Sequence, residues 1–341
     1  MQFEDIYTDG VAVATETYHI YSPNTHKALK RWHSFFIPGN PGCLFYYLPW
    51  LQQMHRMITE EADRVFGVGN VAVCLHGLSH ANHHFTRSDD SANEEKHEIY
   101  GLEFQIDHVE AFIKQTLESV PNSNSNTHDP MVSYIGHSIG AYMILDILDR
   151  SFYLLSKTIT ISCYLIMPFI TWTTLDLSHR ISLNIIKTIP KTITKYFIQK
   201  VSVILNAMPI AKRTSLLSLL QGNDSSSPSM DKSCLNMTSN RFFNTRLLYN
   251  FLDMGLDEIE HVPLNEIRIL NIIKKLSMKY HINILYTNND QWAPLVDLNR
   301  ILDIAPYVNS VYIPDLIHAF TMFISHGSIV TEHLRPLIRN S

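Results

Sequence analysis

The sequence predicts an α/β fold in which a mostly parallel sheet is flanked by helices and carries a helical cap insertion. Two observations predict the sheet: short apolar runs alternate along the chain with helical patterns, and glycines or prolines end several of these runs. A third predicts the cap, because residues 168–260 break this alternation. The 341 residues are enough for one large core with an insertion, and 45% apolar against 17% charged residues is typical of a globular rather than a disordered chain.

The first half of the predicted core is strand, helix, strand. Residues 33–37, HSFFI, predict a buried strand that ends at PGNPG (38–42), since two prolines and two glycines forbid regular structure. The spacing over 44–66 is typical of a helix, and NVAVCLHG at 70–77 predicts a second strand. Residues 102–117 then carry an apolar stripe at helical spacing.

The second half repeats the alternation. Residues 131–135 predict a strand and 141–148 a helix, with a sharp turn between them. Three more strands are expected at 158–167, 282–287 and 310–313. The stretch 152–172 is apolar enough to raise the question of a membrane-spanning helix, but β-branched residues crowd its middle and we expect a strand there.

We therefore predict an α/β core formed by residues 1–167 and 261–341, and a helical cap at 168–260 with a basic, apolar segment. From Leu177 to Asn223 the chain has no Asp or Glu but seven Lys or Arg, although its net charge is −5. Lysines interleaved with Ile and Phe suit a helix lying in a lipid interface, and an ordinary lid helix with solvated lysines is the alternative. The predicted membrane contacts are Lys187, Lys191, Lys195 and Lys200.

The cysteines and the first residues indicate a reducing compartment. Cys43, Cys74, Cys163 and Cys234 stand far apart without metal-binding spacing, so we expect buried free thiols. The N-terminal residues lack a basic start followed by an apolar stretch, and no secretory signal is expected.

The turn after residues 131–135 carries Gly136-His137-Ser138-Ile139-Gly140, which matches G-x-S-x-G. In this pattern the glycines let a strand and the following helix approach closely, and the strained serine projects its hydroxyl outward. The strand before it and the helix after it make Ser138 the predicted nucleophile.

A serine nucleophile needs a histidine base, and the histidine needs a carboxylate that fixes its tautomer. His318 follows the last predicted strand and is the predicted base, with His326 as the fallback. Asp290, in the loop after the strand at 282–287, is the predicted acid. Asp315 is its rival, and Asp297 is expected in the next helix.

The tetrahedral intermediate also needs two backbone donors. The first is the N–H of Ile139, directly after the nucleophile. For the second, element order favours the N–H of Asn40 in the loop 38–42 over the alternative loop 75–77.

With FFIPGNPG, GHSIGAYM, YTNNDQWAP and HAF in this order, the chain resembles the lipid droplet-associated hydrolase family of α/β-hydrolases over about residues 32–325. The resemblance implies an α/β-hydrolase fold and a serine hydrolase on lipid droplets and endoplasmic reticulum, linked to turnover of sterol esters or other neutral lipids. Ser138, Asp290 and His318 match the family's triad positions. Thr287 stands where the family usually has glycine.

These observations predict a serine esterase that needs no cofactor and cleaves lipid esters at the cytosolic face of a droplet or reticulum surface through an acyl-enzyme. A droplet- or membrane-associated tethering protein with little hydrolysis is the alternative, and acyl transfer to an acceptor other than water is a third possibility. No metal site is expected: His76, His80, His83 and His84 lack a nearby cysteine pattern or HExxH and are interpreted as a polar loop near the site entrance. No nucleic-acid partner is expected, because the basic segment has few aromatics and no known module.

Overall fold

A computed structural model of the chain describes residues 1–341 with the exception of 24–27, 29, 84–98, 120–129, 152–160, 172–173, 176–179, 182–183, 186–187, 221–229, 289 and 340–341. At residues 161, 191, 195 and 218–220 it describes the backbone but not the side chain.

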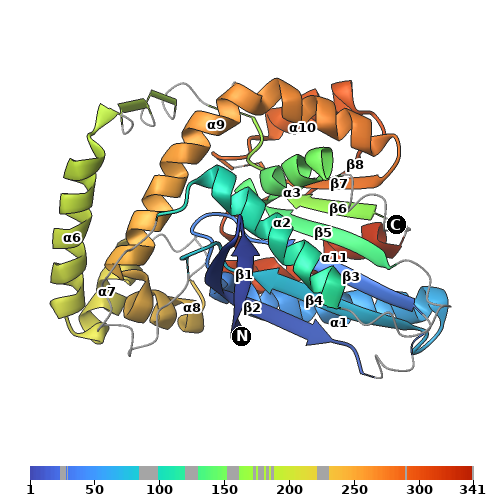
Figure 1. Cartoon of the computed structure of the whole chain (residues 1–341), viewed down its shortest axis with the longest axis horizontal. Helices are drawn as coiled ribbons and strands as arrows, with labels where there is room; N and C mark the ends of the chain where they lie inside the picture. Colours follow the sequence, from blue (N-terminus) through green and yellow to red (C-terminus); the bar gives the residue numbers. More distant parts are fainter. Residues whose placement is uncertain are drawn as a thin grey trace.

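The centre of the molecule is an eight-stranded sheet with the order β1-β2-β4-β3-β5-β6-β7-β8 (Figure 1). The first two strands form an antiparallel hairpin, β2 pairs antiparallel with β4, and every pair from β4 to β8 is parallel. The strands are β1 (Gln2–Thr8), β2 (Val11–Tyr21), β3 (Lys30–Ile37), β4 (Val71–Leu78), β5 (Met131–His137), β6 (Ile161–Ile166), β7 (His281–Tyr286) and β8 (Asn309–Tyr312).

Helices cover both faces of this sheet. The helices α2, α3 and α9 lie over one face, and α1 packs beside α11 on the other (Figure 1). The core helices are α1 (Leu48–Phe66), α2 (Leu102–Ser119), α3 (Ile139–Arg150), α10 (Leu295–Ile304) and α11 (Ile324–Arg339), with short turns η1 (Leu44–Tyr47) and η4 (Phe320–Met322). The cap region contains α6 (Lys191–Ala207), α7 (Ile210–Leu220), α8 (Lys232–Met237), η3 (Thr238–Phe242) and α9 (Thr245–Ser277).

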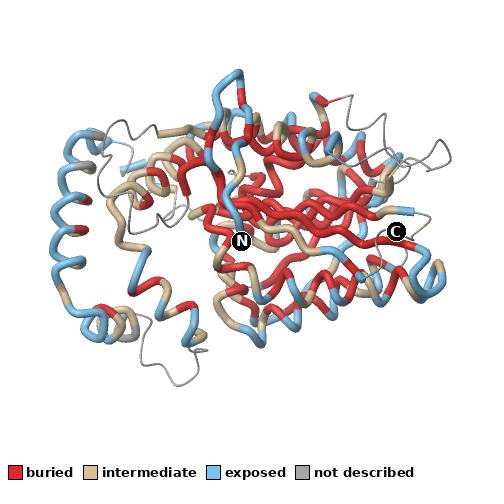
Figure 2. The backbone as a smooth tube through the Cα atoms, turned by 60° about the horizontal axis from the view of Figure 1, so that its bottom comes forward, coloured by how far each residue is buried: buried red, intermediate tan, exposed pale blue. Residues whose placement is uncertain are grey.

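The sheet is the most deeply buried layer, as the red strands of Figure 2 show. All eight residues of β4 are buried, as expected for a strand with a helix layer on both faces. Alternate residues of β3 point to opposite layers: the ring of Phe36 packs against Trp50 of α1, and the ring of Phe35 against Phe112 of α2.

The predicted alternation is confirmed. The six expected strands correspond to β3 through β8 with ends shifted by at most three residues, although the expected start of β6 at 158 lies outside the described residues. The hairpin β1–β2 belongs to the sheet and had not been predicted. The four cysteines are buried and unpaired, as expected. Among the helices that the structure describes, none combines the length and the hydropathy needed to cross a membrane.

The cap joins the core through one long helix. Asn244 begins α9 by accepting hydrogen bonds from the N–H groups of Arg246 and Leu247, and the helix then runs without interruption to Ser277. The expected boundary at 260/261 falls inside this helix, so the division into core and cap stays a prediction. Helix α6 stands at the outer edge of the molecule (Figure 1).

Candidate active site

Ser138 occupies a sharp turn between β5 and α3. Its φ of 54° and ψ of −123° lie in a region that L side chains rarely adopt. Close backbone approach explains both flanking glycines. A Cβ atom on Gly136 would lie 2.7 Å from the backbone nitrogen of Ala141, and one on Gly140 would collide with the carbonyl oxygen of Ile37. This is the backbone geometry that G-x-S-x-G predicts.

The structure brings the predicted nucleophile, base and acid together in one chain of hydrogen bonds. Nε2 of His318 lies 2.8 Å from Oγ of Ser138, and Nδ1 of His318 lies 2.5 Å from Oδ2 of Asp290. His318 comes from the loop after β8 and Asp290 from the loop after β7, so both reach Ser138 at the carboxyl edge of the sheet. A hydroxyl, an imidazole and a carboxylate in this order can transfer a proton away from the serine.

Asp290 is held so that it remains ionised. Its Oδ1 accepts hydrogen bonds from the backbone N–H of Trp292 at 2.8 Å and of Ala293 at 3.0 Å. Burial alone would raise the pKa of this carboxyl. The hydrogen bond and charge of His318 and the two backbone donors outweigh burial and hold the pKa of Asp290 below its ordinary value. A charged carboxylate is the form that stabilises an imidazolium.

Tyr47 and His137 form a buried pair that connects the loops around Ser138. The sequence analysis named His137 only as part of the elbow and did not single out Tyr47. Nε2 of His137 donates to the carbonyl oxygen of His318 at 2.9 Å, which leaves Nδ1 to accept from the hydroxyl of Tyr47 at 2.8 Å. The Tyr47 oxygen in turn accepts from the N–H of Gly39 at 3.2 Å. Burial, with the nearby His318, lowers the pKa of His137 to about 3, so this imidazole stays uncharged beside the predicted base.

The two predicted oxyanion donors are close to the elbow. Ile139 is the first residue of α3, so its N–H has no acceptor within the helix. The loop 38–42 packs on the turn, since a Cβ atom on Gly39 would lie 2.8 Å from Cβ of Ser138, and the N–H of Asn40 has no partner among the described residues. The alternative loop 75–77 is wrong, because these residues lie within β4.

The cap supplies a buried acid, Glu258, next to the loop 38–42. No sequence pattern gave a reason to select this residue. The side chain of Asn40 donates to the carbonyl oxygen of Phe251 in α9 at 3.0 Å. Glu258, about two turns further along α9 than Phe251, is 6% exposed. Its burial raises the pKa of Glu258 to about 8, with the neighbouring Asn40 side chain opposing part of the rise. At neutral pH this side chain is therefore a neutral hydrogen-bonding group beside the oxyanion loop.

The rival residues lie elsewhere. His326 is part of α11, Asp297 lies in the first turn of α10 as expected, and Asp315 is exposed on the loop before His318. The interpretation of the histidine-rich segment as a polar loop is wrong for His76, which belongs to β4. His80 and His83 do lie in the loop after β4, where they are buried against the loop 38–42. His84 lies outside the described residues.

The predicted membrane contacts are described only in part. Lys187 lies outside the described residues, and for Lys191 and Lys195 the backbone alone is described, within α6. Lys200 is exposed on α6, and its Nζ lies 5.2 Å from the centre of the Tyr196 ring. The contact therefore stays a prediction.

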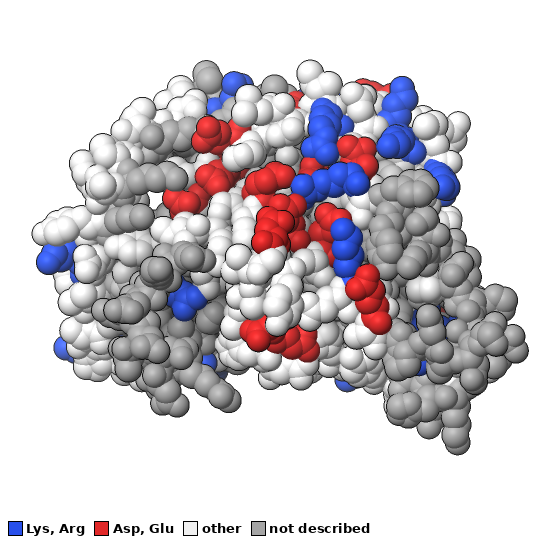
Figure 3. All heavy atoms as spheres, viewed as in Figure 1, with Lys and Arg blue, Asp and Glu red and all other residues white. Residues whose placement is uncertain are grey.

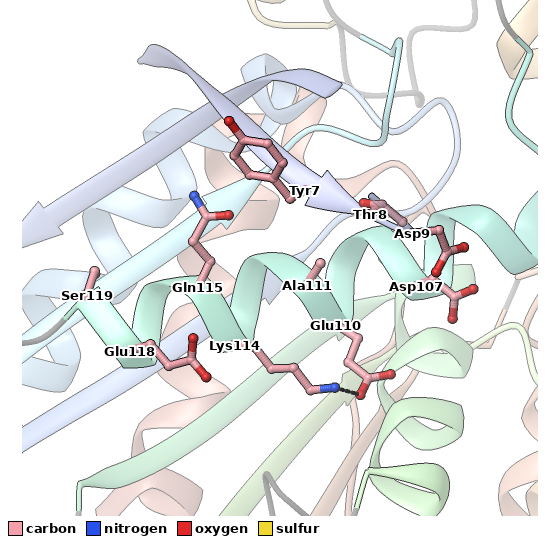
Figure 4. Close-up of a pocket in the computed structure, with 10 residues that line it drawn as sticks. All are labelled: Tyr7, Thr8, Asp9, Asp107, Glu110, Ala111, Lys114, Gln115, Glu118 and Ser119. Atoms are coloured by element: carbon pink, nitrogen blue, oxygen red, sulfur yellow. Dashed lines mark ion pairs between the residues drawn. The ribbon is translucent and has the colours of Figure 1, made fainter. Parts of the chain in front are cut away.

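A hollow of about 630 Å³ lies between the end of β1 and α2 and contains none of the triad residues (Figure 4). Two of the acids that line it are paired: Glu110 lies 2.5 Å from Lys114, and Asp107 lies 2.9 Å from Arg150. Figure 3 shows acidic and basic side chains side by side on the molecular face that includes this region.

Comparison with known proteins supplies a family and a fold. A family model described as lipid-droplet associated hydrolase matches residues 30–321. The lipid droplet-associated hydrolase of Homo sapiens is 34% identical over 137 residues, which cover 40% of this chain and 37% of that relative. The protein of the same name from Rattus norvegicus is 29% identical over 117 residues, covering 34% of this chain and 32% of that relative. The matched segments thus span well under half of the curated relatives' length.

Solved structures match almost the whole chain at low identity. The haloalkane dehalogenase DatA from Agrobacterium tumefaciens C58 has a TM-score of 0.60 and 11% identity, covering 99% of this chain and 96% of that one. A peroxisomal α/β-hydrolase from Saccharomyces cerevisiae has a TM-score of 0.59 and 12% identity over 98% and 84% of the two chains. A thermophilic esterase from Thermogutta terrifontis has a TM-score of 0.53 and 11% identity over 100% and 99%. The fold is that of the α/β-hydrolases.

Proposed function

The chain belongs to the lipid-droplet associated hydrolase family, and from this premise we propose that it is a serine hydrolase that cleaves lipid esters at the cytosolic surface of lipid droplets and endoplasmic reticulum. The observation that carries the proposal is the hydrogen-bonded series Ser138, His318, Asp290 at a strained turn. We propose sterol esters or other neutral lipids as the substrate class.

The proposed reaction follows from the roles that these groups can take. Oγ of Ser138 attacks the ester carbonyl carbon while Nε2 of His318 takes its proton, and the N–H groups of Asn40 and Ile139 stabilise the oxyanion. His318 then gives the proton to the leaving alcohol as the C–O bond breaks, which leaves an acyl-enzyme. Water, deprotonated by His318, releases the fatty acid and restores Ser138.

Helix α6 supports the proposed lipid surface. Its outward side carries large apolar side chains that are more than half exposed: Ile193, Tyr196, Phe197, Val203 and Ile204. The opposite side of α6 faces the rest of the cap, including α9, and its residues Ile198 and Ser202 are buried. A row of exposed apolar side chains on one helix is unfavourable in water and favourable in the acyl boundary of a monolayer. The described part of this edge shows no acidic side chain in Figure 3, which suits anionic headgroups.

A fluorophosphonate probe tests the proposed chemistry against the tethering alternative. Ser138→Ala should abolish labelling and lower ester hydrolysis by at least about 1,000-fold. Ser151 is the matched control, since it is buried at the other end of α3 and its Oγ has no partner among the described residues. If folded wild-type protein is not labelled, the proposal that the chain is a serine hydrolase is contradicted. A panel of sterol esters, glycerides and short-chain esters then identifies the substrate class.

Binding to vesicles or artificial droplets tests the proposed surface. Changing Ile193, Phe197 and Ile204 together to glutamate should weaken binding by more than about tenfold, because these three positions can then no longer bury apolar side chains in the lipid interface. Leu264 and Ile267 on α9 are also highly exposed, and the same change there is the matched control. Equal binding by both variants would contradict a role for α6.

A further inference from the structure

A second cluster of chemically active side chains lies within the sheet, away from the loops that carry the triad. His33 on β3 pairs in register with Cys74 on β4, and His76, two residues further along β4, pairs with His19 on β2. The register places the four side chains on one face of three adjacent strands. His33, Cys74 and His76 are all buried, and His19 lies at the more exposed end of the cluster.

We propose that His33, Cys74 and His76 bind a divalent transition-metal ion of the zinc type. One ligand atom from each of the three residues lies within 4.8 Å of the other two. Nδ1 of His33 and Nε2 of His76 are 3.0 Å apart. Nitrogen ligands of a tetrahedral zinc ion lie roughly 3.3 Å apart when the bonds are about 2.0–2.1 Å, so the two rings need to separate by only a few tenths of an ångström.

The ligand types also fit this ion. One thiolate with imidazoles is a donor set that zinc favours over calcium or magnesium, which take oxygen ligands. Binding would release the thiol proton of Cys74 to solvent. The three residues leave one position of a tetrahedral ion to a further ligand.

The surroundings orient His76 as a metal ligand. Nε2 of His19 lies 3.3 Å from Oε2 of Glu4, which can only accept while it is ionised, so Nε2 carries the proton. Nδ1 of His19 must then accept from Nδ1 of His76, 2.7 Å away. The lone pair of His76 is thereby fixed on Nε2, the atom that faces His33. Histidines that bind a metal usually donate their other ring N–H to an outer partner, which fixes their tautomer. His19, held by Glu4, is that partner for His76.

Hydrogen bonding among the described residues does not satisfy this cluster. Nε2 of His33 is buried and has no partner there. A buried polar nitrogen without a partner destabilises the fold, and an aliphatic side chain at this position would avoid that loss. An ion bound through Nδ1 of His33 and Nε2 of His76 would join β3 to β4, with β2 held through His19. Such an ion would not use the unpartnered Nε2 of His33, so the reason it gives for histidine at these positions is the pair of ligand nitrogens itself.

Zinc titration of the full chain against a chromophoric chelator tests this inference, with bound metal counted by elemental analysis. We expect one zinc ion per wild-type chain. In Cys74→Ser the zinc affinity should be weakened by more than about 100-fold, which is more than the loss of a residue that only hydrogen-bonds to a ligand would cause. Cys163→Ser is the matched control, because Cys163 is a buried, unpaired thiol on β6. Zinc binding no tighter in wild type than in Cys74→Ser would overturn the proposal.

Cobalt(II) loading provides a second test, and its decisive measurement is made on the wild-type chain. Thiolate coordination should give an intense charge-transfer band in the near ultraviolet that is present in Cys163→Ser. A cobalt-loaded wild-type chain without this band would overturn the assignment of Cys74 as a ligand.

Discussion

Replacing Asp290 by asparagine tests the geometry of the candidate active site most directly. Oδ1 of Asp290 accepts two backbone N–H groups, and an asparagine oxygen would keep both hydrogen bonds. The amide nitrogen then takes the place of Oδ2, 2.5 Å from Nδ1 of His318. Since an amide nitrogen only donates, His318 must accept through Nδ1 and carry its proton on Nε2. That nitrogen can no longer accept the proton of Ser138.

The expected loss follows from this change of tautomer. An equivalent substitution in serine proteases lowers kcat by about 10⁴, which corresponds to about 5.4 kcal/mol at roughly 1.36 kcal/mol per tenfold change in rate. Stability should change little by comparison, because the backbone hydrogen bonds of the loop remain. We therefore expect Asp290→Asn to be folded and almost inactive.

Hydrolysis of a short-chain nitrophenyl ester and the rate of fluorophosphonate labelling measure the effect, with thermal unfolding as the check on folding. Asp315→Asn is the matched control: this residue is the rival acid, it is exposed, and asparagine tolerates its φ of 61°. Activity within tenfold of wild type in Asp290→Asn, with a large loss in Asp315→Asn, would refute the assignment.

Three further predictions concern the surroundings of the site. Tyr47→Phe removes the donor to His137 and the acceptor for a loop N–H, so it should lower unfolding free energy by about 2–4 kcal/mol and slow labelling; an unchanged denaturation midpoint would contradict this. Burial raises the pKa of Glu258 to about 8, so the native state keeps a proton that the unfolded state loses near 4.5, and stability should fall as pH rises between these values. Glu258→Gln should flatten that slope in urea unfolding from pH 5 to 8, and an identical slope would count against it. Gly140→Ala should abolish labelling, because its methyl group collides with the carbonyl oxygen of Ile37; normal labelling would contradict the close approach.

The local pattern was sufficient where one short segment decides the structure. The alternation of apolar runs and helical stripes predicted six strands of the sheet, and two glycines around a serine predicted the elbow. The hairpin at residues 2–21 was missed because its strands have mixed exposure and join the sheet through antiparallel pairing with β4, which no local pattern specifies.

Residues that act through distant neighbours could not be found in the same way. Nothing near Tyr47 in the sequence indicates that its hydroxyl would meet His137, and Glu258 looks like an ordinary surface acid of a long helix. The packing of α9 against the loop 38–42 buries it and changes its pKa. The same holds for His33 and Cys74, which only the parallel register of β3 and β4 places side by side.

The sequence by itself determined the fold class, the strained serine turn and the order in which nucleophile, acid and base follow along the chain, because backbone sterics and apolar periodicity act over a few residues. Element order favoured His318 and Asp290 but left His326 and Asp315 as alternatives, and the tertiary structure decided between them, since the base and the acid reach Ser138 from separate loops at one edge of the sheet. It also decided which side of α6 faces outward, because burial of a helix face depends on what packs against it.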